Sequence, residues 1–193
     1  ARAFDDVSGA PLRDPRVRIT IDDGRRYLDQ AATLYDVIVS EPSNPWLSMS
    51  ARLFTREFFT LVRRRLAPGG LLVQWVPLYG LSASQFKTLL RTLSSVFPNL
   101  SIFRVAEGDL VVIASPEKPA VHPEVLDEIF GGESGVVLRA IGVSSPADLV
   151  SRWVADESGL GPVLGRGPIN TDDNGLLEFG SPWYLLRDTV PVN

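Results

Sequence analysis

The sequence predicts an α/β fold with a mostly parallel sheet, closed by an antiparallel hairpin and followed by a small helical appendage. Between residues 17 and 97, short apolar runs alternate with amphipathic stretches of helical length. This alternation is typical of a parallel sheet with helices on its faces. Two more apolar runs, at 100–105 and 109–115, are separated only by a tight "AEG", which predicts a hairpin. We therefore expect one domain over residues 1–115 and an appendage over 116–193.

The first expected strand covers residues 17–21, where apolar and polar side chains alternate as in a half-buried strand. A helix begins near Arg25. Asp22 and Asp23 come directly before it, and one of them is well placed to cap it. The run "YDVIVSEP" follows and reads as a second strand over 36–40, apolar enough to be covered on both faces.

Two amphipathic helices and a third strand complete the predicted sheet domain. Apolar residues recur at helical spacing from Leu53 to Leu66, and "APGG" ends that helix. The third strand is "GLLVQWV", over residues 70–76. The second helix covers 82–97, with one apolar face. We expect the strands at 17–21, 36–40 and 70–75 to be parallel and the hairpin to form one edge.

The appendage is predicted to contain two short helices, a loop and an extended tail. The helices are "HPEVLDEIF" and "SPADLVSRWVAD", the second capped by Ser145 with Asp148 completing a capping box. A loop rich in glycine and proline, "ESGLGPVLGRGP", comes next. The extended tail "INTDDNGLLEFGSPWYLL" follows it.

Composition excludes several classes of site. The chain has no cysteine and a single histidine, His122, so disulfides, thiolate catalysis, cysteine metal sites and multi-histidine metal sites are ruled out. We expect no metal. The net charge of −4 argues against nucleic acid as a partner, because nucleic-acid binders usually carry a basic surplus. No apolar run approaches the length of a membrane helix, and no secretory signal is present.

Polar and aromatic residues gather where the three predicted strands end. These residues are Asp22, Asp23 and Gly24 after the first strand, Glu41, Asn44 and Trp46 after the second, and Gln74, Trp75 and Tyr79 at the third. Each alone could be a helix cap or a turn former. Open α/β sheets bind ligands outside the carboxyl ends of their strands. Together, these residues therefore predict a pocket for a cationic or nucleoside-like ligand.

A second acidic feature lies in the tail, where "NTDDN" places Asp172 and Asp173 in a short polar turn. One interpretation is an ordinary loop. The other is a lid that carries negative charge to the pocket. The sequence leaves both open.

Four stretches of this chain resemble the spermidine synthase family of aminopropyltransferases. They are "DPRVRITIDDGRRYL", "YDVIVSEPSNP", "LFTREFFTLVRRRLAPGGLLVQW" and "NTDDNGLLEF". The likeness is closest to the branch often fused to membrane transporter-like segments, and it is strong over residues 14–115. It implies a methyltransferase-like, Rossmann-like sheet, with decarboxylated S-adenosylmethionine as co-substrate and a diamine, usually putrescine, as acceptor.

The resemblance also implies roles for individual residues. The aspartate of the family's "D-G" turn contacts adenine, which here falls on Asp23, between Asp22 and Gly24. The next strand of the family ends in Asp-x-x-Asp, whose first member accepts the amine proton and whose second binds the amine. Here these positions are Glu41 and Asn44, so the spacing matches and both residue types differ. A tyrosine that the family carries before its last strand is absent, because "VAEG" stands there.

The implied chemistry needs one base. A neutral amine attacks the methylene carbon beside a sulfonium, and the leaving group is a neutral thioether that needs no acid. An alkylamine with a pKa of about 10 must first lose a proton. A carboxylate within hydrogen-bond reach can both attract the ammonium ion and accept that proton. Glu41 is therefore the candidate catalytic base.

The family's glycine-rich loop and its ribose-binding acid belong to two strands that come before "DPRVR", and the sequence contains neither. We therefore expect an N-terminally truncated transferase domain. Two alternatives remain open: a methyltransferase that uses intact S-adenosylmethionine, and a non-catalytic ligand-sensing domain of a membrane-fused protein. The expected partner is a small-molecule amine, and a homodimer and a membrane segment upstream of this chain are both open alternatives. The expected location is the cytoplasm, either free or as the soluble part of a membrane protein.

Overall fold

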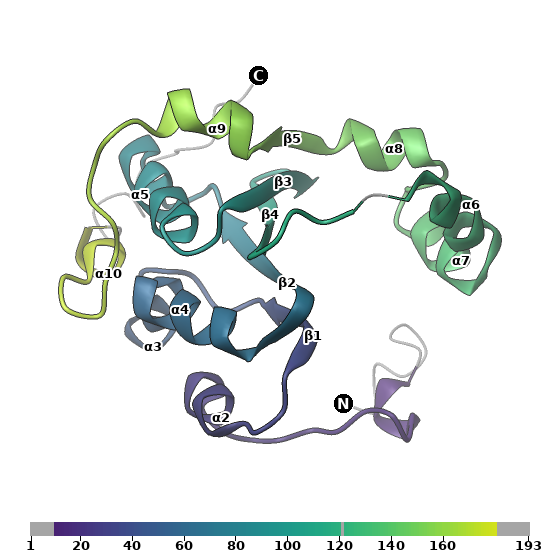
Figure 1. The fold of residues 1–193 in the computed structure, drawn as a ribbon, viewed down its shortest axis with the longest axis horizontal. Coiled ribbons are helices and arrows are strands. Elements are labelled where there is room, and N and C mark those ends of the chain that lie inside the picture. The colour runs from purple at the N-terminus through teal and green to yellow at the C-terminus, as the bar shows by residue number, and fades with distance from the viewer. Residues whose placement is uncertain (1–9, 121, 181–193) are drawn as a thin grey trace. The chain divides into compact units, whose positions relative to one another are not determined.

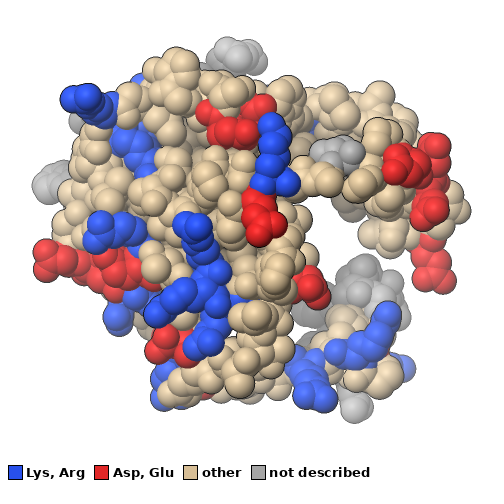
Figure 2. Space-filling model, in the orientation of Figure 1, with Lys and Arg blue, Asp and Glu red and all other residues tan. Residues whose placement is uncertain are grey.

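The computed structural model describes residues 10–120 and 122–180. The chain divides into two compact units, residues 1–30 and 31–193. Among the described residues, no helix is both long enough and apolar enough to cross a bilayer. On the face shown in Figure 2, basic and acidic side chains of the larger unit are interspersed.

The first unit contains a short 3-10 helix η2 (Pro11–Arg13), an extended stretch and helix α2 (Gly24–Gln30). The expected strand at 17–21 is wrong. These residues pair with no other segment that the structure describes, and Ile21 is 99% exposed. Alternation alone does not make a strand, because an extended segment needs a neighbour to accept its backbone hydrogen bonds.

In the described part of the second unit, five strands form the sheet (Figure 1): β1 (Tyr35–Ser40), β2 (Leu66–Pro77), β3 (Asn99–Ala106), β4 (Asp109–Ser115) and β5 (Trp153–Asp156). Their order is β1-β2-β4-β3-β5. Only β1 and β2 pair in parallel, and the other three pairs are antiparallel.

The expectation of a mostly parallel sheet is therefore wrong, and the sheet is mixed. Strand β4 turns back after β3 and pairs with β2, so it separates two strands that run in the same direction. The hairpin of β3 and β4 is confirmed. It does not form an edge, however, because β5 pairs with β3 on its outer side.

Strand β1 is an edge strand, and the expectation that it is covered on both faces is wrong. Its side chains alternate between the two faces of the sheet. Ser40 is buried, whereas Val37 and Val39 on the other face are 51% and 66% exposed. The same asymmetry continues in β2, where Leu72, Gln74 and Val76 are fully buried and the alternate residues are half-buried. One face of the sheet thus carries the core.

Helices α4 (Arg56–Arg65) and α5 (Ala83–Ser94) contribute large side chains to this core. The first expected helix, 53–66, is divided. Helix α3 (Ser48–Ala51) and 3-10 helix η3 (Arg52–Phe54) come first, and Thr55 then caps α4 by accepting a hydrogen bond from Phe58 N at 3.3 Å. The second, 82–97, begins as expected, because Ser82 and Gln85 form a capping box. The fully buried aromatic residues are Phe54, Phe59 and Phe97.

The appendage contains five helices among the described residues. They are α6 (Pro123–Gly131), α7 (Glu133–Ala140), α8 (Pro146–Ser151), α9 (Glu157–Leu164) and α10 (Leu176–Gly180). Helix α6 is confirmed, and α7 was not anticipated. The predicted helix over 145–156 ends at Ser151, because residues 153–156 pair with β3. The predicted loop over 157–168 is mostly helix α9, which Asp156 caps.

The extended tail predicted over 169–186 is also corrected in part. Residues 176–180 form α10, and residues 181–186 lie outside the described residues.

In sequence the glycines and proline of 157–168 indicated a loop. The cap at Asp156, whose Oδ1 accepts hydrogen bonds from Ser158 N and Gly159 N, starts a helix in spite of them.

Candidate active site

The carboxyl ends of β1 and β2 lie side by side, because these two strands are parallel and Ser40 is the partner of Gln74 in their ladder. Glu41 follows Ser40 directly, and its side chain is exposed. Asn44 lies in the turn beyond, where its carbonyl oxygen accepts a hydrogen bond from Leu47 N at 3.0 Å. The adjacency expected for the ends of the second and third predicted strands is therefore present.

Two buried acceptor oxygens near this edge are paired with none of the described residues. They are Asn44 Oδ1 and Gln74 Oε1, which have no hydrogen-bond partner among the described residues. The amide nitrogen of Gln74 donates to the carbonyl oxygen of Trp75 at 2.9 Å. Buried polar atoms are nearly always paired, so an unpaired one calls for a specific explanation. A ligand that donates a hydrogen bond would satisfy Asn44 Oδ1.

Three aromatic residues from different segments meet here, and we call them the ring cluster: Trp46, Trp75 and Tyr79. The ring centroids of Trp46 and Tyr79 are 6.2 Å apart with an interplanar angle of 74°. Those of Trp75 and Tyr79 are 6.4 Å apart with an angle of 58°. Both are favourable edge or tilted arrangements. Tyr79 remains 39% exposed, so the cluster is open to solvent.

The expected position of Gln74 and Trp75 needs correction. Strand β2 continues through Pro77, so both residues lie inside the strand. Successive side chains in a strand point to opposite faces. Gln74 therefore points to the core face, whereas Trp75 points to the half-exposed face with Asp109, whose Oδ1 accepts a hydrogen bond from Trp75 Nε1 at 3.1 Å.

The absence of a side chain at Gly80 leaves room for the ring of Trp46. Its φ is +68°, and a Cβ at this position would lie 2.5 Å from Trp46 Cη2. We expect Gly80→Ala to lower the free energy of unfolding by about 1–3 kcal/mol, because it combines left-handed backbone strain with displacement of the indole. Urea denaturation measures the loss. Gly161→Ala is the control, since its Cβ would meet open space within a helix. An equal effect of both substitutions would contradict this account of Gly80.

Burial raises the pKa of the Tyr79 hydroxyl above its usual value, and the nearby charge of Asp109 adds to this shift. The phenol therefore stays protonated at neutral pH and can donate a hydrogen bond. Its ring keeps the electron-rich face that attracts cations.

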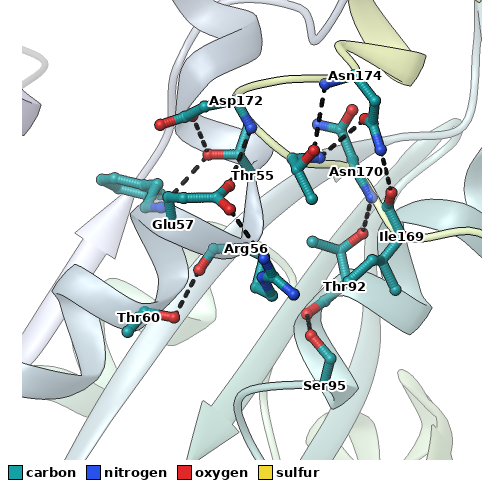
Figure 3. Close-up of polar contacts among 12 residues, drawn as sticks. Thr55, Arg56, Glu57, Thr60, Thr92, Ser95, Ile169, Asn170, Asp172 and Asn174 are labelled. Atoms are coloured by element: carbon teal, nitrogen blue, oxygen red, sulfur yellow. Dashed lines mark hydrogen bonds and ion pairs between the residues drawn. The ribbon is translucent and has the colours of Figure 1, made fainter.

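The "NTDDN" turn is anchored to the helices (Figure 3). Asn170 is 1% exposed. Its Nδ2 donates to Phe54 O at 3.0 Å, and its Oδ1 accepts from Leu177 N at 3.2 Å. Its carbonyl oxygen accepts from Arg56 N at 2.9 Å. This last bond satisfies one of the free N–H groups in the first turn of α4.

Asp172 belongs to the same anchor. Its Oδ1 accepts a hydrogen bond from Thr55 Oγ1 at 2.7 Å, and its N–H donates to Glu57 Oε2 at 2.9 Å. Asp173 is exposed, and the structure gives it no hydrogen bond or ion pair with a described residue. Contact of either carboxylate with substrate stays a prediction.

Asp22, Asp23 and Gly24 belong to the first unit. Asp23 Oδ1 accepts a hydrogen bond from Arg26 N at 2.8 Å, and Asp22 forms an ion pair with Arg26. Asp23 thus caps α2, as one of the two aspartates was expected to do. Contact of these residues with adenine stays a prediction.

Sequence reasoning missed two residues, Asp109 and Asn170. Asp109 begins β4 and is the partner of Pro77, so it reaches Trp75 only through a pairing that the sequence does not reveal. Asn170 precedes the two aspartates that drew attention to its turn. Within residues 10–120 and 122–180, no group of three or more histidine, aspartate or glutamate side chains could hold a metal ion.

Comparison with known proteins gives the family. The family model described as "Spermine/spermidine synthase domain" matches residues 2–118. The chain belongs to this family. It is 33% identical over 128 residues to the polyamine aminopropyltransferase of a Synechococcus strain, covering 62% of this chain and 41% of that protein. It is 36% identical over 93 residues to polyamine aminopropyltransferase 2 of Pseudomonas aeruginosa, covering 47% of this chain and 27% of that one. The chain thus spans less than half the length of these relatives.

Two solved structures share the fold. A spermidine synthase in complex with the transition-state analogue AdoDATO has a TM-score of 0.64 at 22% identity, covering 83% of this chain and 57% of that one. Spermidine synthase from Thermotoga maritima has a TM-score of 0.62 at 23% identity, covering 83% and 56%. The α/β fold of the spermidine synthase family is therefore confirmed, with a mixed sheet of five strands.

Proposed function

We propose that this chain carries the acceptor side of an aminopropyltransferase, which moves an aminopropyl group from decarboxylated S-adenosylmethionine to an amine. The observation that supports this most is the character of the edge formed by β1 and β2. It combines an exposed carboxylate at Glu41, a buried acceptor oxygen at Asn44 that pairs with no described residue, and three aromatic rings. These groups accept hydrogen bonds or attract positive charge. A protonated alkylamine donates hydrogen bonds and carries a positive charge, so it matches them.

The reaction assigns a role to each group. The amine nitrogen forms a bond to the methylene carbon of the aminopropyl group, the carbon–sulfur bond breaks, and its electron pair stays on sulfur in a neutral thioether. Glu41 accepts the proton that the amine nitrogen loses. Asn44 accepts a hydrogen bond from the amine, and the ring cluster packs against its alkyl chain.

Product analysis with two donors tests this proposal. The protein is incubated with 1,4-diaminobutane and either decarboxylated or intact S-adenosylmethionine, and the thioether product is identified by chromatography. We expect methylthioadenosine from the decarboxylated donor at a rate at least roughly tenfold above that of any reaction with the intact donor. S-adenosylhomocysteine from the intact donor would instead indicate a methyltransferase. No thioether from either donor would contradict the transfer reaction proposed for this chain.

Asn44→Asp should improve the use of diamines. A diamine carries two positive charges, and a hydrogen bond between charged groups contributes more than one to a neutral amide. We expect KM for 1,4-diaminobutane to fall by about tenfold, measured from initial rates. Ser43→Asp is the matched control, because it adds the same charge at an exposed neighbouring position. Equal effects of the two substitutions, or no effect of either, would contradict the role of Asn44.

A further inference from the structure

Asp109 is a carboxylate that forms no ion pair with any of the residues the structure describes. Its Oδ1 accepts the indole hydrogen bond of Trp75 at 3.1 Å. The part of the chain that the structure describes gives Asp109 no ion pair, and it gives Asp109 Oδ2 no hydrogen-bond donor. Its side chain is half-buried. Burial penalises an isolated charge, so a cation beside this carboxylate would be favourable.

The surroundings of Asp109 favour a positive charge. Trp75, to which it is bonded, is in ring contact with Tyr79, and Tyr79 is in ring contact with Trp46. Faces of aromatic rings attract ammonium groups, and clusters of rings recognise ammonium ligands in this way. The negative charge of Asp109 reaches this cluster, since it adds to the rise in the pKa of Tyr79.

Other carboxylates are less well placed for this role. Asp172 is held by Thr55 and Glu57 at the start of α4. Glu107 is exposed in the turn of the hairpin, and no hydrogen bond or ion pair ties it to a described ring. Asp109 is the carboxylate that the structure bonds directly to a member of the ring cluster.

We propose that Asp109 and the ring cluster bind the non-reacting ammonium group of a diamine acceptor, so that Asp109 supplies the negative charge that Asn44 lacks. This inference rests on the proposed function, since it names the class of acceptor for the same site. The reacting amine lies at Glu41, and the second ammonium group lies among Trp46, Trp75 and Tyr79. Asp109 is thus a residue that determines specificity for diamines over monoamines.

Calorimetry with two probes tests the inference. In the native protein 1,4-diaminobutane should bind roughly tenfold more tightly than n-butylamine, because only the diamine carries a second charge. Asp109→Asn should weaken binding of 1,4-diaminobutane by about tenfold and leave n-butylamine unchanged. Glu107→Gln is the matched control, because it removes one negative charge from the neighbouring turn. It should change neither affinity, and a thermal melt by circular dichroism confirms that both variants are folded.

Three outcomes would overturn the inference. They are equal affinity of the native protein for the two amines, unchanged diamine affinity in Asp109→Asn, and equal losses in Asp109→Asn and Glu107→Gln. Its failure is distinguishable from failure of the proposed function. If the protein transfers aminopropyl groups and Asp109→Asn keeps full diamine affinity, only the role of Asp109 is wrong. If no thioether forms but Asp109→Asn loses diamine affinity selectively, the amine site stands and the transferase proposal falls.

Discussion

Replacing Glu41 by glutamine should lower the rate of amine transfer by at least about a hundredfold, the effect of losing a positioned general base. Glutamine keeps the length and the hydrogen-bonding shape of glutamate but cannot accept the amine proton. The loss should therefore appear in kcat more than in KM, since binding of the amine also uses the ring cluster. Initial rates of thioether formation at saturating amine measure it.

The pH dependence of Glu41→Gln gives a second measure of the same role. An amine with a pKa of about 10 is mostly protonated at neutral pH. Without a base in the site, the residual rate should rise as the pH approaches that value and more of the amine becomes neutral in solution. Asp36→Asn is the matched control, because Asp36 is an exposed carboxylate on the same strand β1. Full turnover by Glu41→Gln would show that the base lies elsewhere.

Among the substitutions considered, replacing Asn170 by alanine should lower the free energy of unfolding the most. The side chain is 1% exposed and bridges Phe54 O and Leu177 N. Both hydrogen bonds are buried. Each buried polar group left without a partner costs about 1–3 kcal/mol. We therefore expect the free energy of unfolding to fall by roughly 2–5 kcal/mol. Urea denaturation followed by far-ultraviolet circular dichroism measures the change.

Asp173→Ala is the control for Asn170→Ala. It alters the same turn at an exposed side chain, so its effect should stay within about 0.5 kcal/mol. If Asn170→Ala cost no more than this control, the anchoring role of the turn would be wrong. Asp172 and Asp173 would then be better explained as parts of a mobile lid over the site.

Local patterns predicted the local elements well. The capping box at Ser82 and the apolar face of residues 82–97 are encoded within one helix, and that helix forms. The tight "AEG" forces the hairpin in the same way. Residues 153–156 show the limit of this reasoning. Their apolar spacing indicated a helix, but pairing with β3 makes them a strand, and a partner about fifty residues away leaves no local mark.

The residues of the candidate site also divide into those that local patterns predict and those that depend on long-range pairing. The sequence predicts a site at Trp46, Trp75 and Tyr79 because each follows or lies in a predicted strand, and the structure brings their rings together. The sequence did not predict a role for Asp109, because its contact with Trp75 depends on the pairing of β4 with β2. The adjacency of strands is set by long-range packing rather than by periodicity.

The most direct test of an amine site at the carboxyl edge of β1 and β2 is to observe where an amine binds. The four tryptophans of the chain give separate indole N–H signals in a proton–nitrogen correlation spectrum, assigned by single Trp→Phe substitutions. On titration with 1,4-diaminobutane, the signals of Trp46 and Trp75 should shift together and saturate at one dissociation constant. Trp153, on the strand at the opposite edge of the sheet, should not shift. A shift of Trp153 alone, or no shift of Trp46 and Trp75, would contradict the account.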